Sequence, residues 1–492
     1  MALTFTPHVL AFLNPPPGTA FLGTFYYVDD FYNYLSYAQQ AEQGAFRFQN
    51  RVLLEEHPPA LVNLEWWLVG RTSALLGGGR LLVAYRLFAA LAAFGLLFAA
   101  DLWLQRLGVG GGHRLPALVL VATGGGLGGL LFTFANRDLR ECLDLFAGLF
   151  PFLGLLTNPH FVAGTTLLLF GLHLFDTARD GRGRTAAIAV ATVLALVRPY
   201  DLVLLVLIRT AAVLMLDPPR RWLAALAPLA GLLPVVLYLY WLFYRNPAFA
   251  FYAETRYLFP DLWSFAPALG PALLLALPGV LRQAPDREAH RARIQLVAWA
   301  VFGLGVVAAR PVHFSLQFLV GIGLPLLALG AFGLCRSAPR FTVAAVVVSS
   351  TSLLAAVRFV SEPRSPWLAP RSTLELVEAL GHSCRPGDIL FAPPEIGLLA
   401  AGLSPCRAFV SHGVDPGYAH KLALIRTFAD RGPAERASLL DAYRITHLAL
   451  PGDAGEKPAA WLGESTRFRR HAVVGRGPDW SLYIRERGPT AP

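Results

Sequence analysis

Acidic and histidine side chains gather near the start of this 492-residue chain, in a segment that is otherwise rich in aromatic residues. Asp29 and Asp30 are adjacent, and Glu55, Glu56 and His57 close the same segment, YYVDDFYNYLSYAQQAEQGAFRFQNRVLLEEHPP. A carboxylate can act as a general base that takes a proton from an attacking hydroxyl or amine, and a second carboxylate can orient it or bind a metal. Asp29 and Asp30 are therefore candidate catalytic residues.

The acidic pair also has an interpretation without chemistry. An amphipathic helix is expected to begin at Phe31, directly after Asp29 and Asp30. Acids near a helix N-terminus stabilise the helix by about 0.3–1 kcal/mol, so capping alone accounts for one of the two carboxylates. A second acid, followed by further acids at the end of the segment, favours the interpretation as a site.

Glu55, Glu56 and His57 stand before a Pro-Pro pair, which is typical of an exposed turn that starts a helix. In the functional interpretation Glu56 and Asp30 bind a divalent metal (Mg²⁺, Mn²⁺ or Zn²⁺), or a protonated His57 contacts a phosphate. Spacing alone does not decide between these alternatives.

The composition shows what must position these residues. Hydrophobic residues make up 55% of the chain and charged residues 15%, against roughly 25% charge in soluble proteins, so a polytopic membrane protein is expected. The net charge of +10 comes almost wholly from Arg in short loops, which indicates membrane orientation and lipid-phosphate contact rather than nucleic-acid binding. After an interfacial helix over 59–76, spans are expected at about 81–105, 115–134, 160–176, 222–244, 262–281, 294–309, 316–335 and 341–358.

Charged residues interrupt the apolar pattern at three further places. The run 185–216 is broken at Arg198-Pro199-Tyr200-Asp201, where Arg198 either pairs with Asp201 or contacts substrate. Arg137 lies in a loop of alternating charge that is either solvated or part of a site. Arg256 lies in an aromatic loop over 245–263 and is either a solvated residue or a phosphate contact. Because Arg matches phosphate oxygens in a bidentate manner, Arg198, Arg256 and Arg137, with Tyr200, are candidate contacts to a phosphate or substrate.

The composition changes near residue 361, and helix and strand patterns then alternate as in a small α/β domain. The pattern predicts helices over 372–380, 418–431 and 433–443, and strands at DILFAPP, RAFVSHG, ITHLALPG, RHAVV and WSLYIRE. Cys384 and Cys406 are candidates for a disulfide, which leaves Cys142 and Cys335 unpaired. We therefore expect a transmembrane domain over 1–360, with its functional loop at 24–80, and a second domain over 361–492.

The loops RDGRGR and RQAPDREAHRAR are the densest in Arg, and cytoplasmic loops carry the excess of positive charge. Alternation of about eleven spans from this assignment places the loop 24–80 and the C-terminal domain outside the cytosol.

These residues resemble the GT-C superfamily of glycosyltransferases, in particular the family 39-like group of protein O-mannosyltransferases and bacterial lipid A aminoarabinose transferases. Asp29-Asp30 stands where those families have Asp-Glu, and His57-Pro58-Pro59 matches the His-Pro-Pro of the mannosyltransferases. The stretches PPGTAFLG, NPHF, RPYD and SHGVDPGYAHK are also similar to bacterial members of the group, so the likeness covers most of the chain.

The resemblance implies an inverting enzyme of the bacterial inner membrane. It would move a sugar from a polyprenyl-phosphate donor to a lipid, glycan or protein acceptor at the extracytoplasmic face, with Asp29 as the base. The alternatives are a transporter or flippase of lipid-linked sugars, which would also need intramembrane charges, and a scaffold without catalysis.

Overall fold

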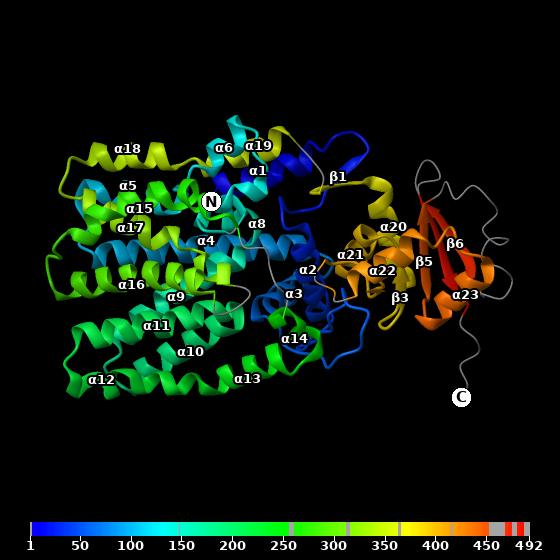
Figure 1. The fold of residues 1–492 in the computed structure, drawn as a ribbon, viewed down its shortest axis with the longest axis horizontal. Helices are drawn as coiled ribbons and strands as arrows, with labels where there is room; N and C mark the ends of the chain where they lie inside the picture. Colours follow the sequence, from blue (N-terminus) through cyan, green and yellow to red (C-terminus); the bar gives the residue numbers. More distant parts are fainter. Residues whose placement is uncertain are drawn as a thin grey trace.

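The computed structural model describes residues 2–146, 148–254, 260–310, 315–362, 366–413, 415, 417–451, 468–474 and 480–486. Figure 1 shows a helical bundle at one end and a sheet with helices at the other, with α2 and α3 between them. The helices up to residue 361 are α1 Ala2–Leu13, α2 Val28–Glu42, α3 Leu64–Leu75, α4 Leu81–Arg106, α5 Arg114–Thr123, α6 Gly128–Phe134, α7 Leu143–Phe146, α8 Pro151–Thr157, α9 Pro159–Thr177, α10 Gly181–Val197, α11 Pro199–Leu216, α12 Pro219–Leu226, α13 Leu233–Tyr244, α14 Pro247–Glu254, α15 Phe265–Leu281, α16 Arg287–Ala309, α17 Gly323–Leu334, α18 Pro339–Ser349 and α19 Ser352–Ser361.

The bundle is a multi-pass membrane structure. Within the described residues, seven helical segments are long and apolar enough to cross a membrane, or eight if a bent pair counts as one span. The seven are Leu81–Arg106, Pro199–Leu216, Pro219–Tyr244, Leu262–Leu281, Arg287–Ala309, Ser315–Leu334 and Pro339–Ser361. Six of them lie on predicted spans, while the predicted total of about eleven stays a prediction. The first apolar helix, α1, has 12 residues, short of the roughly 20 that cross a bilayer.

The interruption predicted in the run 185–216 is confirmed. α10 ends at Val197 and α11 begins at Pro199, so Arg198 lies at the junction of two helices. α11 alone is long enough to span. Proline suits the first position of a helix because its missing N–H has no partner there in any case.

The predicted span over 115–134 is broken, with a bend of 58° between α5 and α6. The break contains glycines at which backbone from other segments approaches closely. A Cβ on Gly126 would lie 2.1 Å from the carbonyl oxygen of Ala268, and a Cβ on Gly129 would lie 2.0 Å from that of Thr351. These glycines therefore allow close packing, and this packing occurs where the helix is interrupted.

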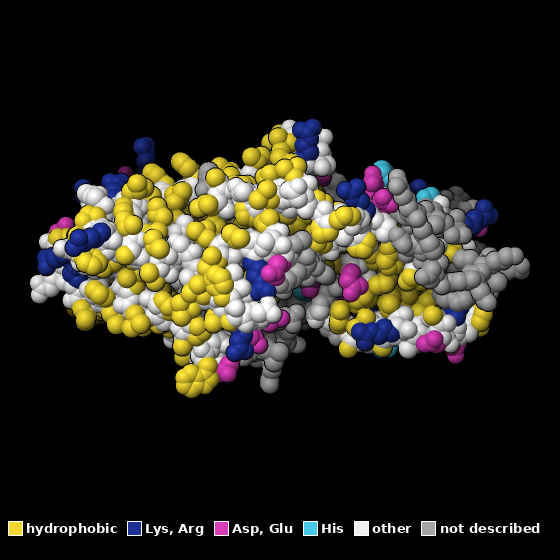
Figure 2. Space-filling view, turned by 90° about the horizontal axis from the view of Figure 1, so that it is seen from above, with side chains coloured by type: hydrophobic (Ala, Val, Ile, Leu, Met, Phe, Trp, Pro, Cys, Tyr) yellow, Lys and Arg dark blue, Asp and Glu magenta, His cyan; other side chains and the backbone are white. Residues whose placement is uncertain are grey.

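The Arg-rich loops predicted to share one side of the membrane do lie together, at the end of the bundle far from the C-terminal sheet. Figure 2 shows Lys and Arg side chains at this end and mainly hydrophobic side chains over the middle of the bundle. Asp176 accepts hydrogen bonds from Arg106 at 2.8 Å and from Arg209 at 2.5 Å. Arg291 pairs with Asp217 at 2.6 Å. These ion pairs join α4, α9, α11 and α16.

The C-terminal part of the chain contains a five-stranded sheet in the order β4-β3-β5-β7-β6, together with helices. β3 is parallel to β4 and β5, whereas β7 is antiparallel to β5 and β6. The strands are β3 Ile389–Phe391, β4 Arg407–Ala408, β5 His447–Pro451, β6 Phe468–Val474 and β7 Trp480–Arg485, and the helices are α20 Arg371–Ser383, α21 Pro394–Leu403, α22 Tyr418–Arg426 and α23 Pro433–Ala442. Each predicted strand and helix has a counterpart here, and α21 was not predicted.

Two contacts fix the C-terminal part. β1, Thr19–Phe21, pairs antiparallel with β2, Leu368–Pro370, so the chain just before α2 is hydrogen-bonded to the chain just after the last span. The predicted disulfide between Cys384 and Cys406 is present, with a Cα–Cα distance of 5.5 Å. Cys142 and Cys335 are free, as predicted.

Substitution of Asp176 tests the ion pairs at the Arg-rich end. Asp176→Asn removes the anion shared by Arg106 and Arg209, whose side chains are buried. Loss of one partner of a buried pair costs about 3–5 kcal/mol, so we expect a clear drop in the Tm of the detergent-solubilised protein. Asp101→Asn is the control, because Asp101 pairs with Arg114 at a partly exposed position. Equal Tm values for the two variants would contradict this account.

Candidate functional site

α2 presents the acidic pair at its N-terminus. The helix begins at Val28, so Asp29 and Asp30 lie in its first turn. The prediction that the helix begins at Phe31, with the acids before it, was wrong by three residues. Tyr26 and Tyr27, with φ of 77° and 52°, adopt left-handed backbone conformations that bulky residues rarely take. This turn starts the helix early and sets the direction of both carboxylates.

Asp30 faces a histidine from the C-terminal sheet region. The Nε2 atom of His412 lies 3.5 Å from Oδ1 of Asp30, and the two side chains are 10% and 40% exposed. Burial lowers the pKa of His412, but the hydrogen bond to Asp30 and the charges of Asp30, Asp29 and Asp415 outweigh it, so the pKa is raised overall. Asp29 is the more exposed of the two acids. The contact with His412 therefore fixes the Asp30 side chain, whereas the Asp29 side chain is exposed.

His57 is committed to the backbone of its own loop. The Asn50 N–H donates to Nε2 of His57 at 3.0 Å, and Nδ1 lies 3.1 Å from the Pro58 carbonyl oxygen. These partners require a neutral ring with its proton on Nδ1, and burial lowers the pKa of His57. A protonated His57 in contact with a phosphate, as predicted, would have to give up the Asn50 hydrogen bond.

Glu55 contacts the C-terminal region as well. Lys421 of α22 lies 2.8 Å from Glu55 and 2.8 Å from Asp415, whose side chain is fully buried. Burial raises the pKa of Asp415, and Lys421 opposes that rise. Glu56, the predicted metal ligand, is exposed. One lysine therefore joins the first loop to the stretch SHGVDPGYAHK.

Backbone contacts hold the same two segments together. The Ala408 N–H of β4 donates to the Arg51 carbonyl at 3.0 Å, and the Ser411 hydroxyl donates to the Val52 carbonyl at 3.0 Å. Arg51 in turn donates to the Ser404 carbonyl at 3.0 Å. α21 also packs against α2. The acidic segment is thus bound to the C-terminal part along its length.

Deeper in the bundle, the sequence stretches NPHF and RPYD come together. Arg198 donates to Asp201 at 3.0 Å, and both side chains are buried. The guanidinium of Arg198 also donates to the Gln317 carbonyl at 2.9 Å and lies 4.8 Å from the ring centre of Phe161. The expected pair with Asp201 is confirmed, and it satisfies part of the guanidinium. Tyr200 packs edge-on against Phe318.

Glu65 is a buried acid that the sequence analysis did not single out. It lies in the first turn of α3 and is 0% exposed. Neither of its carboxylate oxygens has a hydrogen-bond partner among the described residues. Its neighbour Trp66 stacks on Tyr34 and Tyr85. A buried acid without a hydrogen-bond partner favours its neutral form, so Glu65 is a candidate proton-carrying group within the loop 24–80.

Two predicted contacts lie apart from this centre. Arg137 is exposed and pairs with Glu141 at 3.5 Å. Arg256 lies outside the described residues.

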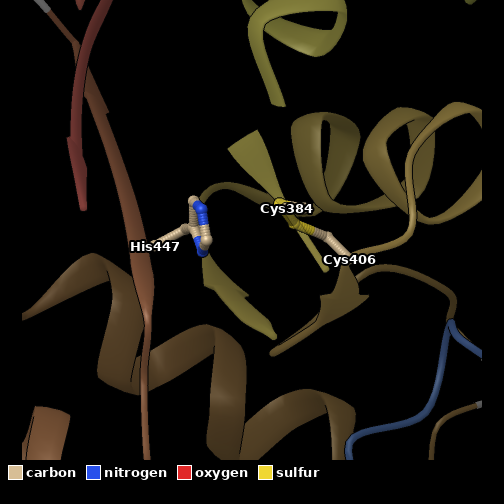
Figure 3. A group of neighbouring side chains, drawn as sticks. All are labelled: Cys384, Cys406 and His447. Atoms are coloured by element: carbon tan, nitrogen blue, oxygen red, sulfur yellow. A yellow bond between two sulfur atoms is a disulfide. The ribbon is translucent and has the colours of Figure 1, made fainter. Parts of the chain in front are cut away.

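The predicted metal ligands do not form a convergent donor group. Within the described ranges, one cluster of at least three His, Cys, Asp or Glu ligand atoms converges, and it consists of Cys384, Cys406 and His447 in the C-terminal sheet (Figure 3). Asp30 is paired with His412 instead. The fit of Asp30 and Glu56 to a metal is thus incomplete, because two donors leave most of a coordination shell to other groups.

The contacts from His412, Asp415 and Lys421 were missed by sequence reasoning. One signal was available: Lys421 is one of two lysines in a chain whose other basic side chains, apart from histidine, are arginines. Lys421 and Glu55 are separated by 366 residues in the sequence. No local sequence pattern predicts a contact over such a separation.

The overall structure is similar to that of known membrane glycosyltransferases. ArnT from Cupriavidus metallidurans bound to undecaprenyl phosphate matches with a TM-score of 0.54 and 13% identity over 98% of this chain and 96% of that one. ArnT in the apo state matches with a TM-score of 0.53 and 14% identity, over 98% and 95%. The Archaeoglobus fulgidus oligosaccharyltransferase tethered with an acceptor peptide matches with a TM-score of 0.51 and 10% identity, over 92% and 68%.

No protein-family model matches the chain, and no curated protein matches its sequence. The structural likeness nevertheless covers nearly the whole chain, and both neighbours are GT-C glycosyltransferases. The chain therefore has the GT-C fold, and the predicted resemblance to that superfamily is confirmed at the level of the fold.

Lys421→Met tests the link between the first loop and the C-terminal part. The change removes the cation that pairs with the buried Asp415 and with Glu55. We expect faster hydrogen exchange at residues 50–57, because the loop loses its ionic contact, and a lower Tm. Arg426→Gln is the matched control, since Arg426 is exposed on the same helix. Unchanged exchange at 50–57 in the Lys421 variant would show that Lys421 does not hold the loop.

Proposed function

We propose that this protein is an inverting glycosyltransferase that moves a sugar from a polyprenyl-phosphate donor to an acceptor at the extracytoplasmic membrane face. The observation that carries the proposal is the acidic pair of α2, which lies in a GT-C fold at the junction of the membrane bundle and the C-terminal sheet. ArnT in complex with undecaprenyl phosphate supports the donor class.

The proposed reaction is a direct displacement at the anomeric carbon. The acceptor oxygen or nitrogen forms the new bond from the face opposite the phosphate while the bond between the anomeric carbon and the phosphate oxygen breaks. Asp29 takes the acceptor proton, and polyprenyl phosphate leaves with the electron pair of the broken bond. Asp29 suits this task because it is exposed at the start of α2. One carboxylate base is sufficient when the leaving group is already an anion stabilised by cations.

Asp30 is proposed as a positioning residue. Its contact with His412 fixes the first turn of α2 on the side of the C-terminal sheet. The first turn carries Asp29 as well, so the direction of the base follows from the position of its neighbour. His412 and Lys421 offset part of the negative charge of Asp30, Glu55 and Asp415.

Donor-phosphate contacts remain a proposal for Arg198, Arg256, Arg137, His57 and Tyr200. Arg198 is the best supported, because it is a buried cation within the bundle that lies over Phe161. A divalent metal bound by Asp30 and Glu56 would add positive charge that stabilises the anionic donor phosphate. The proposed displacement contains no step on this metal, because the described donors fit such an ion only in part.

The topology is part of the same proposal. Residues 1–360 are assigned to the membrane domain, with 24–80 as its functional loop, and 361–492 to an extracytoplasmic domain. The grouping of the Arg-rich loops at the end of the bundle opposite α2 supports this orientation, and it agrees with a bacterial inner-membrane location.

Asp29→Asn tests the proposed base. The variant keeps the size and most hydrogen bonds of the side chain but cannot accept a proton, so transfer from a lipid-phosphate sugar is expected to fall about 10²–10⁴-fold with an unchanged Tm. Glu435→Gln, at an exposed acid of α23, is the control and should transfer normally.

The assay uses purified protein in lipid vesicles, with product sugar and released polyprenyl phosphate measured by mass spectrometry. Near-normal turnover by Asp29→Asn would remove Asp29 from the mechanism. Movement of a lipid-linked sugar across the vesicle membrane without release of polyprenyl phosphate would favour the flippase alternative.

A further inference from the structure

A second group of chemically active side chains lies beside the C-terminal sheet, away from the acidic pair. Cys384 follows α20, Cys406 precedes β4, and His447 begins β5. Their ligand atoms all lie within 4.8 Å of one another. Figure 3 shows the imidazole of His447 projecting from its strand toward the two sulfurs. All three residues are buried, with exposures of 7%, 0% and 0%.

The ring of His447 is oriented by its neighbour in sequence. The Thr446 hydroxyl donates to the Ile389 carbonyl at 3.2 Å and accepts from the Ile389 N–H at 2.9 Å. The Thr446 hydroxyl hydrogen is therefore already donated to the Ile389 carbonyl. Because the Thr446 hydroxyl oxygen lies 3.0 Å from Nδ1 of His447, it accepts a hydrogen bond from Nδ1–H. This network assigns the proton to Nδ1 and the lone pair to Nε2. A metal-binding histidine is held by the same kind of contact.

The residue types and distances match a zinc site. Zinc prefers thiolate sulfur and imidazole nitrogen, at about 2.3 Å and 2.0–2.1 Å, so its tetrahedral ligand atoms lie about 3.3–3.8 Å apart. Three donors within 4.8 Å need only small shifts to reach that spacing. A Cα–Cα distance of 5.5 Å places both cysteine side chains on the same side of the site. In the disulfide, however, neither sulfur is a thiolate.

We propose that Cys384, Cys406 and His447 bind one zinc ion when the disulfide is reduced, so that the metal and the disulfide are alternative occupants of one site. A dithiol reductant supplies two electrons and two protons and leaves as its own disulfide. Zinc then displaces the two thiol protons and forms two sulfur–zinc bonds and one nitrogen–zinc bond. A fourth position is left for water or a neighbouring oxygen.

Either the disulfide or the zinc ion would fix the chain segment around Cys406. Cys406 lies between Ser404, whose carbonyl accepts from Arg51, and Ala408, whose N–H donates to the Arg51 carbonyl. The bond or the metal therefore holds the strand that contacts the first loop. In an oxidising compartment the disulfide is favoured, and zinc would hold the thiols before oxidation. The proposal does not depend on the proposed transferase activity.

Cobalt binding tests the site, because thiolate-bound Co²⁺ absorbs strongly in the near ultraviolet and tetrahedral Co²⁺ has intense visible bands. The full-length protein carries Cys142→Ala and Cys335→Ala, so that only the pair remains. It is reduced with a dithiol in detergent, freed of the dithiol without oxygen, and titrated with Co²⁺. We expect one Co²⁺ per chain with both signatures, displaced by Zn²⁺, and no binding by the oxidised protein.

Single substitutions assign the ligands. Cys384→Ser is expected to abolish the sulfur absorption, and His447→Ala to weaken Co²⁺ binding about ten-fold or more. His382→Ala is the matched control, since His382 lies two residues from Cys384 but is exposed. It should bind like the parent. Absence of the sulfur absorption in the reduced parent, or unchanged affinity in His447→Ala, would overturn the proposal.

Alkylation of the natural sequence gives an answer that does not rely on variants folding. Reduced protein is treated with iodoacetamide, with and without Zn²⁺, and the modified cysteines are identified by mass spectrometry. Zinc should protect Cys384 and Cys406 and leave Cys335, which is partly exposed, equally reactive. Equal alkylation of Cys384 and Cys406 under both conditions would overturn the proposal.

Discussion

Pairing of the acids in the first loop with cations from the C-terminal sheet region is the interaction on which the candidate site depends. A buried charge needs a partner, and the buried groups here are His412, Lys421 and Asp415, with side-chain exposures of 10%, 5% and 0%. Asp30 has His412, and Glu55 has Lys421, which also neutralises the buried Asp415. The packing of α21 on α2 keeps these partners in place. The C-terminal part is therefore a component of the site.

Much of the fold follows from the sequence, because membrane spans and their ends are encoded locally. The predicted span 262–281 corresponds to Leu262–Leu281, where Pro260 and the charged loop after residue 281 mark the ends. The break at Arg198 was also visible, since a charge followed by proline cannot continue an apolar helix. The early start of α2 was not, because nothing in the types of Tyr26 and Tyr27 predicts a left-handed backbone.

The sequence indicated the candidate-site residues of the first segment but not the residues that contact them from distant parts of the chain. Asp29 and Asp30 stand out because two acids interrupt a hydrophobic and aromatic context. Their partner His412 lies in a different part of the chain, and a contact over such a separation has no periodic pattern. Glu65 was hidden for another reason: a single acid after Asn63 looks like an ordinary first-turn acid of a helix, and only its complete burial distinguishes it.

The pairing of β1 with β2 affects the order in which the protein matures. Residues 19–21 emerge early in synthesis, but their strand partner at 368–370 follows the seven candidate spans found in the described residues. The acid-bearing helix starts a few residues after β1 and can take its final place only when translation has passed the last span. An unfinished nascent chain therefore lacks the assembled candidate site until β2 has been synthesised.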